Sequence, residues 1–216
     1  MLINGMKVKM NKIKLFLREL LFPTPKTKED ELNDKYPKSD IYYKRTDDKT
    51  YQVDIRNFIQ EYDSKIPRIV GKTDDEIALN GLKLVRSKLK YTPDKTQYGL
   101  NEYWCYAYQT WNNRKGDCED GAILLHNILL RSGIPYWKLR LSAGFVVGGG
   151  HAYLTYYCEE TYTWVILDWC YWPNNSPINE RKDYKDEKMY GLTWFSWNKK
   201  YCYTKGLNTK AKELLR

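Results

Sequence analysis

Apolar residues recur at helical intervals in two stretches of the chain. The first stretch follows a segment with capping-box spacing, residues 73–76, and carries Ala78, Leu82, Val85 and Leu89. The second, residues 118–130, is nearly all apolar, with Asp117 as the expected N-cap and Gly133 just past its end. The pattern therefore predicts two helices, and the second is expected to be buried at the centre of the domain.

Three later runs are rich in Tyr, Val, Ile, Leu and Trp and predict β-strands at residues 137–147, 151–158 and 164–172. Three glycines, residues 148–150, permit a sharp turn between the first two strands. The polar spacer 159–161 suits a hairpin, and the apolar segment 194–197 is expected to dock back onto the sheet. Two helices followed by an antiparallel sheet indicate an α+β fold.

The N-terminal part is polar apart from one amphipathic stretch. Residues 1–22 predict a basic helix whose apolar residues are Ile13, Phe16, Leu17, Leu20 and Leu21. Such a helix either packs on its own domain or contacts a membrane surface or a partner. We expect residues 23–65 to form a polar connector with one short element near 51–59. The main domain is predicted at residues 66–203, followed by a C-terminal tail at 204–216.

The composition is that of a globular protein with a basic surface. A chain of 216 residues supports one domain with a proper core, and 36 Lys and Arg against 27 Asp and Glu give a net charge of +9. Only 10 of the basic residues are Arg, and they are scattered. This favours a solvated basic surface over a nucleic-acid site. The excess of Lys over Arg suits an AT-rich genome, such as that of a phage or a low-GC bacterium.

Neither a membrane span nor a disulfide framework is expected. No stretch reaches the roughly 20 uncharged apolar residues of a membrane span, and no small-residue cleavage site follows the apolar run 13–22. The five cysteines are an odd number without C-x-x-C spacing, which argues against disulfides and against a zinc knuckle. We therefore expect a reducing, cytoplasmic location, which includes a phage-encoded or virion-associated protein.

Cys118 stands where a cysteine can become a nucleophile. It opens the second predicted helix directly after Gly116 and Asp117, and the N–H groups and dipole of a helix N-terminus favour a thiolate. A buried structural cysteine is the ordinary alternative for this residue type. The neighbours Glu119 and Asp120 would oppose ionisation of the thiol. We expect Asp120 instead to bond backbone groups that shape the turn.

A histidine and a carboxylate follow in an order that suits acid–base chemistry. Of the two histidines, His126 lies in the middle of a helix, as core histidines do, whereas His151 opens a strand after three glycines. Asp168 lies within an apolar run, where a buried charge is costly unless it is paired. The 17 positions from His151 to Asp168 span two antiparallel strands and a tight connection. Cys118, His151 and Asp168 thus suit the roles of nucleophile, general base and orienting carboxylate.

Three short motifs resemble a known superfamily. They are Gly116-Asp117-Cys118-Glu119-Asp120, Gly150-His151-Ala152-Tyr153 and Leu167-Asp168-Trp169. In this order they are similar to the Cys, His and Asp motifs of the transglutaminase-like superfamily, in particular its bacterial and phage cysteine proteinases. The likeness covers residues 73–172, and residues 195–198 are similar to a late motif near the site.

The resemblance implies a papain-like fold, in which a central helix with the cysteine packs on an antiparallel sheet. It also implies thiol acyl transfer: Cys118 attacks an amide carbonyl of a protein or peptide, His151 moves the proton, and Asp168 fixes the imidazole tautomer. Either water or an amine then takes the acyl group, so that the enzyme is a peptidase, an amidase or a transglutaminase.

The remaining site residues are candidates. The backbone N–H of Cys118 is expected in the oxyanion hole, and Gln109 and Trp111 are candidates for a second donor. The candidates for a substrate groove are Tyr98, Tyr103, Trp104, Tyr106, Gly149, Gly150 and Trp169. No metal site and no cofactor are expected, because no closing pair of ligands and no phosphate-binding loop occur in the sequence.

Two further functions stay open at this stage. One is a catalytically silent transglutaminase-like module for binding or assembly, which would use the basic N-terminus and the Tyr and Trp surface. The other is a cell-wall amidase, since rows of Tyr and Trp can stack on sugars. The sequence also leaves open the oligomeric state and whether the N-terminal segment is a propeptide, a lid or an anchor.

Overall fold

The computed structural model describes residues 26–34, 36–172 and 174–204. The chain divides into a unit of residues 1–35 and a compact unit of residues 36–216. In the first unit the described part contains helix α2 (Lys28–Asp34). The helix predicted over residues 1–22 lies outside the described residues, as does most of the predicted tail. Within the described ranges no helix is long and apolar enough to cross a membrane.

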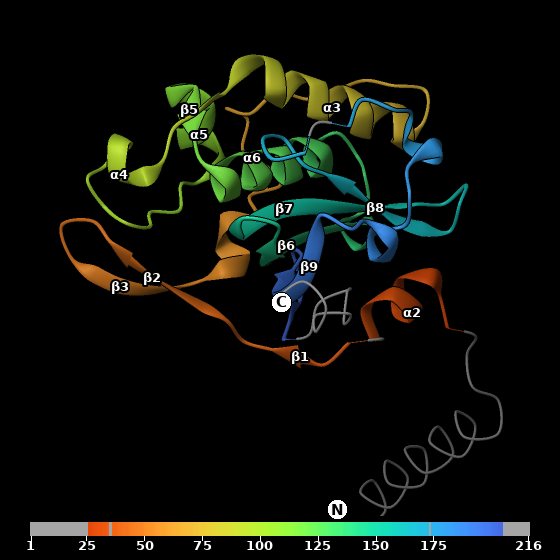
Figure 1. Cartoon of the computed structure of the whole chain (residues 1–216), viewed down its shortest axis with the longest axis horizontal. Helices are drawn as coiled ribbons and strands as arrows, with labels where there is room; N and C mark the ends of the chain where they lie inside the picture. The colour runs from red at the N-terminus through yellow and green to blue at the C-terminus, as the bar shows by residue number, and fades with distance from the viewer. Residues whose placement is uncertain (1–25, 35, 173, 205–216) are drawn as a thin grey trace, which may run out of the picture. The chain divides into compact units, whose positions relative to one another are not determined.

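Both helices predicted from apolar spacing are present in the compact unit. Helix α3 (Asp74–Lys88) begins at Thr73, whose side chain accepts a hydrogen bond from the Glu76 N–H. Helix α6 (Cys118–Arg131) has Asp117 at its N-cap position, and Gly133 follows its end with a φ of 102°. Every residue from Glu119 to Leu130 is buried. Helix α6 is central because it lies between α3 and the sheet (Figure 1).

A six-stranded antiparallel sheet forms the other layer, in the order β1-β10-β9-β6-β7-β8. Its strands are β1 (Lys38–Ser39), β6 (Leu139–Val146), β7 (Gly149–Cys158), β8 (Thr163–Leu167), β9 (Tyr190–Trp197) and β10 (Cys202–Tyr203). The three predicted strands and the docking of residues 194–197 are confirmed. The predicted α+β, papain-like arrangement of a Cys-bearing helix on an antiparallel sheet is confirmed as well.

The third predicted strand is shorter than expected. It ends at Leu167 rather than at 172, because the Asp168 carboxylate accepts hydrogen bonds from the N–H groups of Cys170 and Tyr171. These bonds turn the chain away from the strand ladder. Asp168 therefore sits just past the end of β8, where its side chain can face the neighbouring strand.

The remaining elements are short. They are β2 (Tyr42–Thr46), β3 (Thr50–Asp54), η1 (Ile55–Phe58), β4 (Lys90–Tyr91), α4 (Asp94–Gln97), α5 (Ala107–Asn113), β5 (Lys115–Gly116), η2 (Tyr136–Lys138), η3 (Ile178–Glu180) and η4 (Tyr184–Asp186). The parallel pair β4–β5 places Tyr91 beside Gly116, two residues before the helix that carries Cys118.

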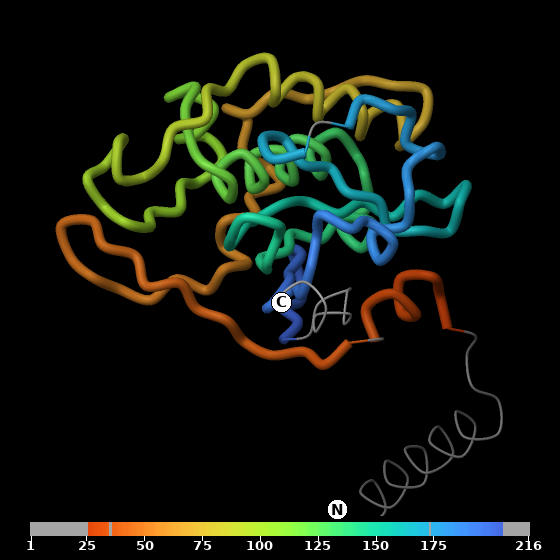
Figure 2. Tube along the Cα trace, viewed as in Figure 1, coloured from red at the N-terminus to blue at the C-terminus, as the bar shows by residue number. Residues whose placement is uncertain are grey.

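The compact unit begins at Tyr36, well before the boundary expected at residue 66. Strand β1 extends the main sheet by pairing with β10. Strands β2 and β3 form a hairpin, and after it Ile55 and Phe58 are buried in the main core. Figure 2 shows this part of the chain, in orange, leading from β1 out to the hairpin. Its few apolar residues are isolated among Lys and Asp, so the sequence pattern alone predicted a connector.

Strand β7 has one open side at its N-terminal end. It pairs with β6 from Gly149 to Tyr156, but with β8 only from Leu154 onward. The first residues of β7 therefore extend past the end of β8. Helix α6 packs against β7, and its first residue, Cys118, accepts a hydrogen bond from the Ala152 N–H of β7, so this end of the sheet is where the predicted site residues gather.

Candidate active site

Cys118 is the first residue of α6, and Trp169 fixes the turn that carries it. The indole Nε1 of Trp169 donates a hydrogen bond to the Cys118 carbonyl oxygen at 3.1 Å. The same indole lies against Gly121, since a Cβ there would come within 2.2 Å of Nε1. Glycine at position 121 is therefore required for this contact, which links the loop after β8 to the first turn of α6.

The thiol of Cys118 is held in its protonated form. Burial is the main cause that raises the pKa of Cys118 to about 12; the charge of Asp117 acts in the same direction, and a hydrogen bond from the Ala152 N–H acts against both. The thiol donates to Oε2 of Glu119 at 3.4 Å. A helix terminus contributes about 0.3–1 kcal/mol, which is less than one pKa unit. The predicted lowering of this pKa is therefore wrong, because burial outweighs the helix terminus.

His151 and Asp168 form a buried pair. Nε2 of His151 lies 2.6 Å from Oδ2 of Asp168, and the two residues are 9% and 2% exposed. Burial opposes ionisation of Asp168, but the hydrogen bonds from His151, Cys170 and Tyr190 together hold its pKa below the usual value. The pair predicted from the spacing of two strands is therefore present, with an ionised carboxylate against the imidazole.

Asp168 has a further partner that the sequence did not indicate. The hydroxyl of Tyr190, at the start of β9, donates to Oδ2 of Asp168 at 2.8 Å. The other oxygen, Oδ1, accepts the backbone N–H groups of Cys170 and Tyr171 at 3.0 and 3.1 Å. Both oxygens are thus engaged, and the carboxylate has one orientation. Tyr190 lies in a polar stretch, and only the pairing of β9 with β6 brings it to the site.

The thiol of Cys118 contacts the backbone next to His151 at the open end of β7. Ala152, whose N–H donates to the Cys118 thiol, is the residue directly after His151. The other histidine, His126, is completely buried in α6, and burial lowers its pKa to about 3. It is a core histidine, which leaves His151 as the candidate base.

Neither candidate for the second oxyanion donor is assigned by the geometry. The side-chain oxygen of Gln109 accepts the Tyr106 N–H at 2.9 Å and so caps α5. The ring of Trp111 lies 3.5 Å from the guanidinium carbon of Arg114. Both residues stay predictions for this role, together with the backbone N–H of Cys118.

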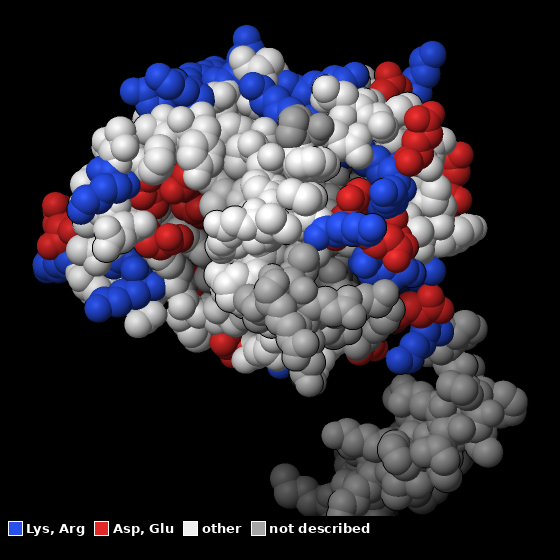
Figure 3. All heavy atoms as spheres, in the orientation of Figure 1, with Lys and Arg blue, Asp and Glu red and all other residues white. Residues whose placement is uncertain are grey.

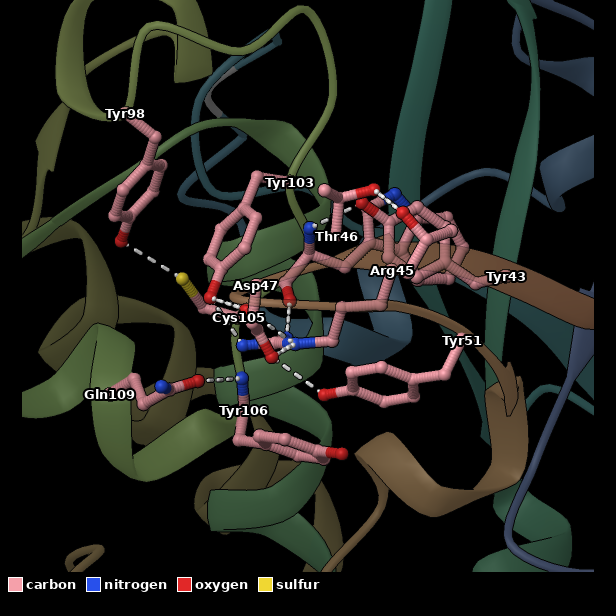
Figure 4. Close-up of polar contacts among 12 residues, drawn as sticks. Tyr43, Arg45, Thr46, Asp47, Tyr51, Tyr98, Tyr103, Cys105, Tyr106 and Gln109 are labelled. Atoms are coloured by element: carbon pink, nitrogen blue, oxygen red, sulfur yellow. Dashed lines mark hydrogen bonds and ion pairs between the residues drawn. The ribbon is translucent and has the colours of Figure 1, made fainter.

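Most of the aromatic residues predicted for the groove contact the β2–β3 hairpin instead. Figure 4 shows Tyr103 and Tyr106 around Arg45 and Asp47 of this hairpin. The Tyr103 hydroxyl donates to Asp47 at 2.6 Å, and Tyr98 lies 3.0 Å from the Cys105 thiol. The rings of Tyr103 and Tyr106 therefore fasten the hairpin to the segment before α5, whereas Tyr98 contacts Cys105 of that segment.

Trp104 lies in the core and does not line a groove. Its side chain is 6% exposed and is stacked between Tyr43 at 4.9 Å and Trp197 at 5.5 Å. The prediction for Trp104 is wrong because residues 42–58, expected as a connector, cover it. Gly149 and Gly150 are exposed at the start of β7, next to His151.

Four carboxylates gather at the start of α6 and form what we call the carboxylate cluster: Asp94, Asp117, Glu119 and Asp120. One oxygen from each lies within 4.8 Å of the others. Burial and the charge of Asp117 raise the pKa of Asp94 to about 7, and burial raises those of Glu119 and Asp120 well above the usual value. No metal site was predicted from the sequence. Asp94 is far from the other three residues in the sequence, and only the fold brings it into the cluster.

Each residue of the carboxylate cluster has one buried oxygen without a hydrogen-bond partner. None of the four oxygens accepts a hydrogen bond from any residue that the structure describes: Oδ1 of Asp94, Oδ1 of Asp117, Oε1 of Glu119 and Oδ2 of Asp120. The other oxygen of Asp120 accepts the Cys105 N–H at 2.8 Å, so its predicted role in shaping the backbone is confirmed. The unpartnered oxygens are the group that a cation would bind.

Comparison with known proteins finds a matching family model for part of the chain. Residues 72–168 match the family model of the bacterial transglutaminase-like cysteine proteinases, a range that contains Cys118, His151 and Asp168. This match over residues 72–168 supports a cysteine peptidase of the transglutaminase-like superfamily. A search of curated proteins finds no match.

Solved structures of LapG from Legionella pneumophila are also similar. The calcium-bound form is 20% identical over 73% of this chain and 81% of LapG, with a TM-score of 0.49. A second LapG structure is 21% identical over 68% and 74% of the two chains, with a TM-score of 0.47. The EGTA-treated form is 21% identical over 69% and 73%, with a TM-score of 0.48.

Proposed function

We propose that the protein hydrolyses an amide bond of a peptide or protein, with Cys118 as nucleophile, His151 as general base and acid, and Asp168 as orienting carboxylate. The observation that supports this most strongly is the buried His151–Asp168 pair at 2.6 Å. The pair lies near the N-terminus of α6, and among the described helices α6 is the one that begins with a cysteine. A family of cysteine proteinases implies protein substrates.

The resting thiol needs a base, because its pKa is about 12. Since Nε2 of His151 faces Asp168, Nδ1 is the nitrogen that takes the thiol proton as the sulfur attacks the carbonyl carbon. The oxyanion forms beside the Cys118 N–H. The tetrahedral intermediate then collapses, the C–N bond breaks, and the leaving amine takes the proton from His151.

The second half of the reaction frees the enzyme. Water attacks the thioester carbonyl while His151 accepts one of its protons, and the C–S bond breaks to release a carboxylic acid and the thiol. An amine in place of water would give transamidation through the same steps. Asp168 keeps the imidazole in one orientation throughout and stabilises the imidazolium that forms.

A screen of acceptors and substrates tests this proposal. The protein is incubated with a peptide library, with peptidoglycan fragments, and with peptides plus a fluorescent primary amine, and products are read by mass spectrometry. Cys118→Ala is the matched control. New peptide N-termini that need Cys118 support hydrolysis of peptides. Incorporation of the amine would identify the enzyme as a transglutaminase. Cleavage of peptidoglycan fragments alone would identify it as a cell-wall amidase. The absence of any product would indicate a catalytically silent module.

A second candidate function belongs to the carboxylate cluster: we infer that it binds a divalent cation. Ca²⁺ takes carboxylate and carbonyl oxygens as ligands, and the cluster offers four carboxylates. Each of them carries one buried oxygen without a partner among the described residues. Asp94, Asp117, Glu119 and Asp120 would hold the ion. Bound there, it would offset the negative charge beside Cys118 that opposes formation of the thiolate.

Calcium is expected to stabilise the folded protein. At a free concentration 100 times the dissociation constant, binding adds about 2.7 kcal/mol, which for a chain of this size raises Tm by roughly 5–10 °C. The measurement is thermal unfolding by circular dichroism in Ca²⁺ and after chelation with EGTA. Asp94→Asn should lose most of the rise, whereas the exposed Glu160→Gln should keep it. An equal rise in Asp94→Asn would contradict the assignment of the cluster.

A further inference from the structure

Tyr190 is a buried tyrosine whose hydroxyl contacts the carboxylate of Asp168. Its side chain is 2% exposed, and the hydroxyl donates to Oδ2 of Asp168 at 2.8 Å. The same oxygen lies 2.6 Å from Nε2 of His151. One carboxylate oxygen thus joins the phenol and the imidazole, so a change at Tyr190 reaches His151 through a single atom.

The pairing of the strands brings Tyr190 to this position. It is the first residue of β9 and pairs with Val146 of β6. Side chains alternate between the two faces of a strand, so His151 and Tyr153 of β7 share one face. The ring of Tyr190 packs against that of Tyr153 at 4.9 Å and 70°. Tyr190 therefore lies on the face of the sheet that carries His151.

The ring of Tyr190 also supports two other rings that contact His151. Tyr153 lies 6.0 Å from the imidazole and is inclined by only 19°, and Tyr171 lies 5.1 Å from it. Tyr190 meets Tyr171 edge on at 5.8 Å, as it does Tyr153. A phenylalanine at position 190 would keep these ring contacts and lose the hydroxyl, so the two contributions can be separated.

The other charged or titratable groups at Asp168 come from α3 and from its own loop. Arg86 of α3 donates to the Asp168 carbonyl oxygen, and the Cys170 thiol lies within 4.8 Å of a carboxylate oxygen. Figure 3 shows that the middle of the visible face, over β7, carries mostly uncharged side chains. The state of the carboxylate therefore depends mainly on its close partners, one of which is the Tyr190 hydroxyl.

We infer that Tyr190 is a positioning residue: its hydroxyl fixes Oδ2 of Asp168 and, through that oxygen, holds the imidazole of His151 in one orientation. The inference rests on the proposed amide hydrolysis, in which Nδ1 of His151 takes the thiol proton. The backbone N–H groups of Cys170 and Tyr171 hold only Oδ1. Without the phenol, the carboxylate and the imidazole could shift together.

The hydroxyl of Tyr190 is a permanent donor. Burial and the charge of Asp168 raise the pKa of Tyr190, so the phenol keeps its proton. Its hydrogen bond in turn helps to lower the pKa of Asp168. Loss of this bond would raise the pKa of the carboxylate and so weaken its hold on the imidazole as the pH falls.

The test is the steady-state kinetics of Tyr190→Phe on the peptide that the wild type cleaves best. We expect kcat to fall by about 10- to 100-fold, which is what one hydrogen bond to a charged group is worth. KM should stay unchanged because Tyr190 is buried. The acid limb of the pH profile of kcat/KM should move to higher pH, because the pKa of Asp168 rises.

Tyr184→Phe is the matched control. Tyr184 is 1% exposed and belongs to the same apolar cluster, but its hydroxyl lies 2.5 Å from that of Tyr153. This variant should keep the kcat and the pH profile of the wild type. Circular dichroism verifies that both variants are folded. In an Asp168→Asn background, Tyr190→Phe should change kcat by less than about twofold, because Tyr190 acts through Asp168.

The outcomes separate this role from the proposed function. Equal kcat and equal pH profiles in Tyr190→Phe and the wild type would overturn the positioning role alone. An equal loss in Tyr184→Phe would overturn it as well, since the effect would then come from packing of the cluster. A full further loss in the Asp168→Asn background would show that Tyr190 does not act through Asp168. No cleavage by the wild type would overturn the proposed function and the role of Tyr190 with it.

Discussion

Asp168→Asn is expected to lower kcat by about 10³- to 10⁴-fold with the fold intact. Oδ1 of Asp168 accepts two backbone N–H groups, so the amide oxygen of an asparagine would take this position. Its NH₂ group would then face His151, and Nε2 would have to accept rather than donate. The imidazole proton would move to Nδ1, which could no longer take the proton of the Cys118 thiol.

The measurement is kcat and KM on the best peptide found in the screen. KM should change little, because Asp168 is buried and meets no substrate. The matched control is Asp186→Asn. Asp186 is exposed, so this variant should keep wild-type rates. A loss smaller than about tenfold in Asp168→Asn would show that the tautomer of His151 does not limit the reaction.

The second large effect is expected from Gly121→Val. A Cβ at this position would come 2.2 Å from Nε1 of Trp169, so either the indole or the first turn of α6 must move. The hydrogen bond from Trp169 to the Cys118 carbonyl would be lost. We expect kcat/KM to fall by about 100-fold, since a shift of roughly 1 Å in a nucleophile costs this much. The free energy of unfolding should fall by about 1–3 kcal/mol.

A double mutant separates this clash from a general effect on the helix. In Trp169→Ala the space beside Gly121 is empty, so adding Gly121→Val should cost little further stability. The measurement is urea unfolding of the two single mutants and of the double mutant. Strictly additive losses of stability would contradict the contact between Gly121 and Trp169 as the cause.

The parts of the fold that the sequence predicted are those with a local signal. Helix α6 follows from a continuous apolar run with a cap at each end, and the strands around His151 follow from β-branched and aromatic runs. The pairing of His151 with Asp168 was predictable because two strands and a short turn join them. Each of these conclusions needs only neighbouring residues.

The parts that were missed depend on contacts between distant segments. Asp94 reaches the carboxylate cluster because β4 pairs with β5, and two-residue strands leave no periodic pattern. Tyr190 reaches Asp168 because β9 lies beside β6. Trp104 is buried by the hairpin at residues 42–54, whose side chains are mostly polar. The pKa of Cys118 was misjudged for the same reason, since the depth of its burial depends on the packing of α6 on β7.

The central claim is that His151 activates Cys118. The most direct measurement is the rate at which iodoacetamide alkylates Cys118, resolved from the other cysteines by peptide mass spectrometry, from pH 5 to 10. In His151→Ala the rate should be low at neutral pH and rise about tenfold per pH unit, as for a thiol of pKa about 12. The wild type should react at least about 100-fold faster at pH 7. Equal rates and equal pH profiles in the two proteins would contradict the account.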